Sequence, residues 1–280
     1  MQLELAQIPL VDGVVAPNLA RTLDAIGKRR AGTDLMVFPE ATLTGFPTRE
    51  RVRDVAETLS GPSLCAVRDA ARNAQVAVAV GLAERDSSDN ERFYNTTVLI
   101  DERGEIALRY RKTHLWATDV GVFTPGDRFE VCEFKGMTVG LLICYDIEFP
   151  EPARALGVLG AEMLIVTNGN MDPFGPVHRR AIVARAMENQ AFAALVNRTG
   201  DGDDNLTFPG ESALISPFGD VLAELESDDA VLPVTVDRAL LAQSREHYSY
   251  LHDARVALNL ADENNAQGRR SLNIRARTSR

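Results

Sequence analysis

Cysteine is scarce in this chain of 280 residues, which contains only Cys65, Cys132 and Cys144. No two of them form a CxxC pair, and none has a matching histidine spacing, so neither a disulfide framework nor a zinc site is expected. Free thiols are typical of proteins from reducing compartments. We therefore expect a cytoplasmic protein.

Long apolar runs and an excess of positive charge are also missing. No apolar segment approaches the ~20 residues of a membrane span, and the N-terminal MQLELAQIPL lacks the basic start and apolar core of a signal peptide. The formal net charge of −10 and the pI of about 5.0 disfavour binding to nucleic-acid phosphates or anionic lipid. The composition therefore predicts neither a nucleic-acid partner nor a membrane partner.

One basic segment stands at the C-terminal end. Its arginines are Arg269, Arg270, Arg275, Arg277 and Arg280. A nucleic-acid-binding tail would usually be longer and denser in charge. We find no repeat and no low-complexity linker, so we expect residues 1–260 to form a single domain. Residues 261–280 are expected to form an Arg-rich tail that is flexible or packs on a partner subunit.

Short apolar segments followed by helical patterns are what the sequence does contain. The predicted strands cover residues 35–38, 76–82, 97–100, 105–110, 139–143, 163–166 and 191–196, with a turn at residues 101–104 that indicates a hairpin. One helix is predicted from a cap at Asn18 to Gly32, another begins at Gly61, and two more cover residues 152–159 and 177–189. Apolar strands alternating with helices predict sheets covered by helices, an α/β layered fold.

Cys144 is the sharpest candidate for chemistry, because it stands where the predicted strand 139–143 ends. Reactive groups in layered α/β proteins gather at the carboxyl ends of strands. Helix-terminal N–H groups at such a corner would favour a thiolate. The alternative is an inert core thiol, which is our interpretation of Cys65 on a helix face and of Cys132 in a strand.

Glu40 and Lys112 are weaker candidates when each is taken alone. Glu40 follows a predicted strand, where burial would raise its pKa and let it act as a base, although many glutamates in such places are solvated or cap a helix. Lys112 either stabilises a thiolate and a developing oxyanion or is an ordinary surface residue of a basic stretch. Asn170 and Asn197 also follow predicted strands, which would place them on the same rim.

The motifs around these residues, taken together, resemble the Glu-Lys-Cys triad of the nitrilase (carbon–nitrogen hydrolase) superfamily. They are FPE at residues 38–40, YRKTHL at 110–115, FTPGD at 123–127 and ICYDIEFPE at 143–151. Residues 184–189 and 248–255 resemble later signatures of the same family. The resemblance runs through most of the chain, and the three motifs that carry Glu40, Lys112 and Cys144, found in this order, are far more specific than any one of them.

The resemblance implies a four-layer α-β-β-α sandwich, assembly into homodimers or larger homo-oligomers, and neither a metal nor an organic cofactor. It also implies acyl transfer through a thioester. Glu40 would take the thiol proton, Cys144 would attack an amide carbonyl, and Lys112 with the backbone N–H of Tyr145 would hold the oxyanion. Asp119 stands where many members have a second glutamate, and it would orient Lys112 with a shorter side chain.

The implied substrate is a small-molecule amide, because the motifs resemble amidases that act on amino-acid amides or on 5-aminopentanamide. Asp146, Glu148 or Asp204 would then receive a substrate ammonium, unless these carboxylates only support the local turns or are solvated. Asn170 either contacts the substrate or is an ordinary turn residue.

Other functions stay open at this point. An N-carbamoyl amine or amino-acid hydrolase would use the same triad and release carbon dioxide as well as ammonia, and a nitrilase also fits the triad. A non-catalytic interaction protein on the same scaffold would have no reason to retain all three residues. A papain-like protease is disfavoured, because it needs a histidine base and no histidine of this chain stands in its signature.

Overall fold

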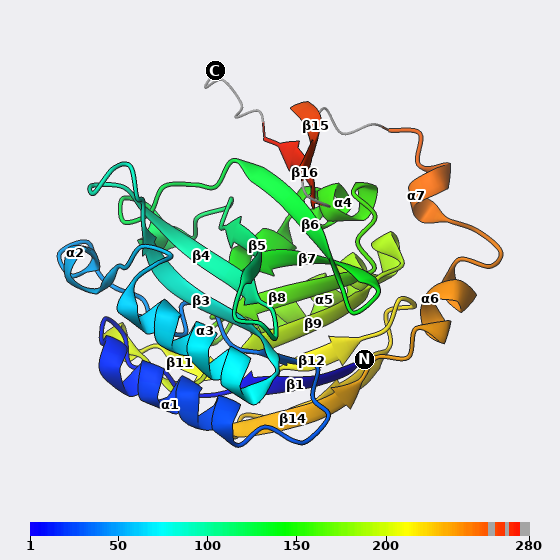
Figure 1. Cartoon of the computed structure of the whole chain (residues 1–280). Coiled ribbons are helices and arrows are strands. Elements are labelled where there is room, and N and C mark those ends of the chain that lie inside the picture. The colour runs from blue at the N-terminus through cyan, green and yellow to red at the C-terminus, as the bar shows by residue number, and fades with distance from the viewer. Residues whose placement is uncertain (257–260, 267–268, 275–280) are drawn as a thin grey trace.

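Two β-sheets pack face to face in the computed structural model, which describes residues 1–256, 261–266 and 269–274. Helices cover the outer face of each sheet, so the layers follow the order α-β-β-α (Figure 1). The α/β layered sandwich predicted from the sequence is confirmed.

The first sheet has six strands in the order β14-β1-β2-β3-β4-β5. Its strands are β1 (Gln2–Gln7), β2 (Leu35–Val37), β3 (Ala77–Arg85), β4 (Phe93–Ile100), β5 (Ile106–Arg111) and β14 (Ala230–Thr235). Strands β1, β2 and β3 run parallel, whereas β4 pairs antiparallel with both β3 and β5. The β4–β5 pair is the predicted hairpin. Asp101 closes its turn by accepting hydrogen bonds from the backbone N–H groups of Arg103 and Glu105.

Strand β3 shows how the sequence separates the layers. Ala77 and Ala79 face the second sheet, while Val78 and Val80 pack under the helices, because side chains along a strand alternate between its two faces. The helices on this side are α1 (Val15–Gly27) and α3 (Pro62–Ala74). The small alanines let the two sheets approach closely.

Helix α1 differs from the prediction at both ends. Asn18 lies inside the helix, where its side chain exchanges two 2.8 Å hydrogen bonds with the backbone of Val11. The helix ends at Gly27 and does not extend to Gly32. The prediction of an Asn18 cap was wrong, because this asparagine fastens the preceding loop to the helix.

The second sheet has eight strands in the order β13-β12-β9-β8-β7-β6-β16-β15. They are β6 (Arg128–Phe134), β7 (Met137–Ile143), β8 (Met163–Asn168), β9 (Phe192–Asn197), β12 (Ala213–Ile215), β13 (Val221–Glu224), β15 (Ala261–Ala266) and β16 (Arg269–Asn273). Strands β7, β8 and β9 run parallel. Helices α4 (Pro150–Val158) and α5 (Gly175–Asn189) cover the outer face. Leu156 of α4 occupies the space over Gly140, where a Cβ would come within 2.8 Å of it.

Shorter helices and strands lie in the connections around the sandwich. They are α2 (Val52–Val55), α6 (Ala239–Ser244), α7 (Tyr250–Asp253), η1 (Ala117–Asp119), η2 (Cys144–Glu148), η3 (Asp203–Asn205), β10 (Thr199–Asp201) and β11 (Thr207–Pro209). Within the described residues, the helices are all too short or too polar to cross a membrane.

Part of the predicted tail belongs to the second sheet. Strand β16 pairs antiparallel with β6, where Leu272 lies opposite Phe129 and is buried. The prediction of a flexible or partner-packed tail is therefore corrected for residues 269–273, because the backbone edge of β6 pairs with them. The predicted tail arginines outside the described residues are Arg275, Arg277 and Arg280. The domain boundary at residue 260 stays a prediction.

The main core lies between the sheets. Leu5 and Val37 of the first sheet and Leu141 and Ile165 of the second are fully buried in one cluster. Burying such a side chain contributes about 1.5–3 kcal/mol relative to leaving it exposed. This contact fixes the two sheets against each other. It therefore also fixes the positions of the loops at the carboxyl ends of their parallel strands.

Candidate active site

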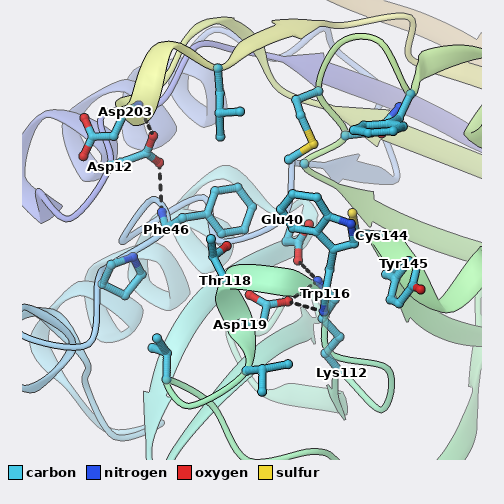
Figure 2. Close-up of a pocket in the computed structure, with 18 of the residues that line it drawn as sticks. Asp12, Glu40, Phe46, Lys112, Trp116, Thr118, Asp119, Cys144, Tyr145 and Asp203 are labelled. Atoms are coloured by element: carbon cyan, nitrogen blue, oxygen red, sulfur yellow. Dashed lines mark hydrogen bonds and ion pairs between the residues drawn. The ribbon is translucent and has the colours of Figure 1, made fainter.

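Loops from both sheets meet at one edge of the sandwich. Glu40 follows β2, Lys112 follows β5 and Cys144 follows β7. The backbone N–H of Glu40 donates to the carbonyl of Asn168, the last residue of β8, at 3.1 Å, so the sheets are joined at this point. The structure brings Glu40, Lys112 and Cys144 together at one cavity of about 500 Å³ (Figure 2).

Cys144 occupies a strained corner between β7 and η2. Its φ of 45° lies in the left-handed region, which a residue with a side chain enters at a cost of about 1–3 kcal/mol. Ile143 and Ile147, both fully buried, hold the backbone on either side. The corner turns the thiol away from the strand and toward the cavity, where it is 8% exposed.

Lys112 is enclosed between two carboxylates. Its Nζ donates to Glu40 Oε1 and to Asp119 Oδ2, each at 2.7 Å, and the side chain is 2% exposed (Figure 2). The alternative of an ordinary surface lysine is therefore wrong. Asp119, the last residue of η1, reaches Lys112 although its side chain is shorter than that of glutamate.

The charges of this cluster depend on one another. Burial acts to lower the pKa of Lys112, but the negative charges of Glu40 and Asp119 outweigh it and raise that pKa well above its ordinary value. Burial raises the pKa of Glu40, against the opposing effect of Lys112. Burial and then the charge of Glu40 raise the pKa of Cys144 well above its ordinary value. A raised pKa disfavours the thiolate, which agrees with the expectation that Glu40 takes the proton of the Cys144 thiol and not with a thiolate favoured by helix-terminal N–H groups.

The two carboxylate oxygens of Glu40 differ in their hydrogen bonds. Oε1 accepts from Lys112 and, at 2.7 Å, from the Nδ2 of Asn95, a polar residue inside β4. Among the residues described, Oε2 is buried without a hydrogen bond of ordinary geometry, and the interaction of the carboxyl with the Cys144 thiol lowers the pKa of Glu40. An acceptor left in this state costs about 1–3 kcal/mol. Oε2 is therefore the atom positioned to take a proton from a reacting group.

Asp146 does not line the cavity, and its prediction as a substrate-binding residue is corrected. It is fully buried, and its carboxylate accepts hydrogen bonds from Tyr110 Oη, Thr113 Oγ1 and the backbone N–H groups of His114 and Ile143. Three of these donors flank Lys112 and the fourth precedes Cys144. Asp146 therefore fastens the lysine segment to the cysteine corner.

Other predicted residues do line the cavity. Tyr145, Glu148 and Asn170 all contribute to its wall. The backbone of Asn170 exchanges two hydrogen bonds with the side chain of Asn197, at 2.9 and 3.0 Å, so both strand-end asparagines lie beside the site as expected. The side chain of Asp204 lies outside the described part of the structure.

Metal ligation has no candidate in residues 1–256, 261–266 and 269–274, where no group of three His, Cys, Asp or Glu side chains could hold an ion. The expected absence of a metal and of an organic cofactor stays a prediction.

Residues 3–246 match the family of carbon–nitrogen hydrolases. The chain belongs to this family. The resemblance seen in the sequence motifs is thereby confirmed for residues 3–246 of this carbon–nitrogen hydrolase, and the motif at residues 248–255 lies outside the match.

Known proteins similar to this hydrolase include several amidases. It is 50% identical over 99% of both chains to an (R)-stereoselective amidase of Pseudomonas sp.. The solved structure of an amidase from Nesterenkonia sp. is 28% identical, with a TM-score of 0.82 over 91% of this chain and 93% of that one. A variant of that amidase, 27% identical with a TM-score of 0.78 over 91% and 94% of the two chains, carries the acetamide moiety of fluoroacetamide covalently added at its active-site cysteine.

His178 was not predicted as a site residue of this hydrolase. It lies in α5, is 3% exposed, and lines the cavity. Its ring joins Asn168 to Glu148, with 3.0 Å contacts on each nitrogen. No local pattern distinguishes it, because its partners come from β8 and η2 and meet it only in the folded chain.

The wall opposite the cysteine was also missed. Asp12 accepts hydrogen bonds from the backbone N–H groups of Phe46 and Asp203 (Figure 2), and it pairs with the fully buried Arg198 at 2.6 Å. The Arg198 guanidinium stacks on Phe208 at 3.9 Å. One buried ion pair thus fixes the loops that carry Phe46 and Asp203, and breaking such a pair typically costs about 3–5 kcal/mol.

Proposed function

We propose that this carbon–nitrogen hydrolase is a cysteine-dependent amidase that converts a small aliphatic amide to its acid and ammonia. The observation that carries the proposal is the buried grouping of a carboxylate with a free oxygen, a charged lysine and a strained cysteine at one cavity. The amidases among its relatives support the same chemistry.

The reaction begins with proton transfer from Cys144 to Glu40. Oε2 of Glu40 takes the thiol proton as the sulfur attacks the amide carbonyl carbon, so the high pKa of the resting thiol is no obstacle. Two of the three Lys112 ammonium protons are used by Glu40 and Asp119. The third, with the backbone N–H of Tyr145, stabilises the oxyanion.

The intermediate then breaks its carbon–nitrogen bond. Glu40 returns the proton to the nitrogen, ammonia leaves, and a thioester to Cys144 remains. Glu40 next takes a proton from water, whose oxygen attacks the thioester. The carbon–sulfur bond breaks, the acid leaves and the thiolate recovers the proton from Glu40.

Ammonia release by the Cys144→Ala variant tests the proposal. Removing the nucleophile should lower turnover by at least about 10⁴-fold while leaving the fold intact. Cys65→Ala is the matched control, because it removes a thiol that lies on α3, remote from the cavity. Turnover of the Cys144→Ala variant near the wild-type rate, with a native circular-dichroism spectrum, would reject the assignment.

The substrate panel separates the proposed amidase from its two catalytic alternatives. It should contain short amides, their N-carbamoyl counterparts and the corresponding nitriles. Carbon dioxide release from carbamoyl compounds in excess of amide turnover would identify an N-carbamoyl hydrolase. Preferential hydrolysis of the nitriles would identify a nitrilase.

We also propose a homodimeric or larger assembly. Met187 on α5 is 42% exposed, and Phe218, on the turn packed against α5, is 44% exposed. Exposed apolar groups of this kind, collected on one outer layer, are typical of subunit contacts. Light scattering after size exclusion measures the mass, and a Met187→Arg variant should shift it toward the monomer.

The cytoplasmic location is a proposal as well. It is supported by the three free cysteines, which a reducing compartment preserves. Cell fractionation with an antibody to the chain tests it, and recovery in an oxidising compartment would contradict it.

A further inference from the structure

One polar side chain of the first sheet lies directly against the base. Asn95 belongs to β4, where it pairs with Ala83 of β3 and is 1% exposed. Buried strand positions usually hold apolar side chains. A buried amide is unfavourable unless its hydrogen bonds are formed, so the presence of an asparagine at this position needs a physical reason.

The amide of Asn95 is only half satisfied. Its Nδ2 donates to Glu40 Oε1 at 2.7 Å, whereas its Oδ1 is buried and forms no hydrogen bond within the part of the chain that the structure describes. A carboxylate oxygen only accepts, so the Asn95 atom that faces it is the amide nitrogen. Because an orphaned buried acceptor is unfavourable, packing alone does not explain the asparagine. The hydrogen bond to Glu40 is what this position provides.

The backbone of Asn95 holds the lysine of the triad. Its carbonyl accepts from the N–H of Lys112 at 2.8 Å, which continues the pairing of β4 with β5 past Arg111. The side chain of Lys112 then donates to Oε1 of Glu40. The side chain and the backbone of one asparagine therefore contact both charged members of the triad.

Two donors on Oε1 decide which oxygen of Glu40 reacts. Lys112 Nζ and Asn95 Nδ2 each lie 2.7 Å from Oε1, and they come from different strands of the sheet. One donor fixes a distance, whereas two donors from different directions fix the orientation of the carboxyl group. The other oxygen, Oε2, is left for the Cys144 thiol, with which this carboxyl also interacts.

We propose that Asn95 is a positioning residue for Glu40: its amide N–H holds Oε1 so that Oε2 is directed at the thiol, and its carbonyl aligns the segment that carries Lys112. Asn95 is not part of the cavity lining, so it acts through Glu40 and not on the substrate. The inference deepens the proposed amidase function and rests on the role of Glu40 as the base.

Loss of the Asn95 amide should change the pH profile in a defined direction. A hydrogen bond to a carboxylate favours its charged form, so removing the bond raises the pKa of Glu40. Only deprotonated Glu40 takes the thiol proton, so the acid limb of kcat/KM in Asn95→Leu should move to higher pH, by about one unit. At neutral pH kcat should fall by about 10- to 100-fold with little change in KM, a part of what a positioned base contributes.

Thr97→Val is the matched control. Thr97 follows Asn95 by two residues on β4, on the same face of the strand. Its buried hydroxyl forms a 2.7 Å hydrogen bond with Thr167 of β8. Valine removes this bond between the sheets but leaves the contacts of Glu40 and Lys112 in place. Both variants should lower the melting temperature, whereas the acid limb should move only in Asn95→Leu.

Alkylation of Cys144 by iodoacetamide gives a readout without turnover. In a Cys65→Ala background, with the label located by peptide mass spectrometry, the rate should fall as the pH drops through the pKa of Glu40, because the carboxylate takes the thiol proton. Asn95→Leu should move this fall to higher pH. Asn95→Ala removes the same donor without filling its space, and it provides the measurement if the leucine variant does not fold.

The outcomes separate this inference from the amidase proposal. Amide hydrolysis with an acid limb at the wild-type pH in the Asn95 variants leaves an amidase but overturns the positioning role. An equal shift in Thr97→Val also overturns it, because the shift then reports a general loosening between the sheets. If no amide is hydrolysed, the amidase proposal fails, while an alkylation profile that shifts only in the Asn95 variants still supports the positioning of Glu40.

Discussion

Asp119 and Glu40 both accept a hydrogen bond from Lys112, yet their roles differ. Glu40 has a free oxygen for proton transfer, whereas Asp119 has its Oδ2 engaged with Lys112 Nζ and with the backbone N–H of Trp116. Asp119 is therefore a positioning residue, which fixes the direction of the ammonium and adds to its charge stabilisation.

Replacing Asp119 by asparagine should lower kcat with little change in KM. The substitution keeps the shape but removes one of the two charges that hold Lys112, and loss of an orienting partner of this kind costs about 10- to 100-fold. Steady-state ammonia release measures it. Asp119→Glu restores the charge and should retain most of kcat, and a fully active Asp119→Asn would remove the positioning role.

The pH profile should reveal the base. Only deprotonated Glu40 can take the thiol proton, so kcat/KM should fall as the pH drops through its pKa, which burial raises above the ordinary value of 4.5. The charge of Asp119 contributes to that rise. Asp119→Asn should therefore move the acid limb to lower pH. If the acid limb of the Asp119→Asn variant does not move, the ionisation that sets this limb is not that of Glu40.

Single residues differ in how far the sequence reveals them. Glu40 and Cys144 follow apolar strands, and their position at strand ends survives folding. Asp146 also lies near a strand end, but it is buried away from the cavity. Its hydrogen-bond donors Tyr110, Thr113 and His114 lie in a distant segment of the sequence, so the local pattern does not reveal them. A buried carboxylate and a substrate-binding carboxylate look alike until these partners are known.

At the level of elements, the loop after β8 packs tightly against the catalytic carboxylate and leaves no space for a side chain. A Cβ added to Gly169 would lie 2.5 Å from the Phe46 ring and 2.9 Å from Glu40 Oε2. The glycine thus lets the loop after β8 approach the reactive carboxylate closely.

Gly169→Ala should lower kcat/KM by about 10- to 100-fold, because it displaces either the base or the aromatic wall and small misplacements are expensive in catalysis. Gly27→Ala is the matched control, since a Cβ there meets nothing within 4 Å. Amide hydrolysis and thermal unfolding are measured on both variants. Wild-type activity in Gly169→Ala would show that the contact relaxes without effect.

Strands with continuous apolar sequence were predicted well, whereas some short or edge strands were missed. The parallel strands β2, β7, β8 and β9 fall within a few residues of their predicted ranges. Strand β14 was missed, because most of its residues are partly or fully exposed and it contains Pro233, as edge strands do. Strand β12 has only three residues, which is too short to show a period.

The whole molecule depends on how its sheet edges are covered. A chain that stops after Val256 would lose β16 and leave the backbone edge of β6 unpaired. We expect a lower melting temperature and increased self-association, which thermal unfolding and light scattering measure. Leu272→Ala, which removes only a buried side chain, should cost about 2 kcal/mol without exposing the edge. An unchanged melting temperature on truncation would contradict this role of β16.

The hydrogen bond from Glu40 to Asn168 has a consequence for any assay of this enzyme. The proton acceptor and the ammonium belong to one layer and the sulfur to the other, so neither half of the sandwich holds a reactive centre by itself. During gradual denaturation, catalysis should therefore vanish once the layers slip, while the circular-dichroism signal of the strands persists. Catalytic activity therefore reports whether the two sheets remain packed against each other.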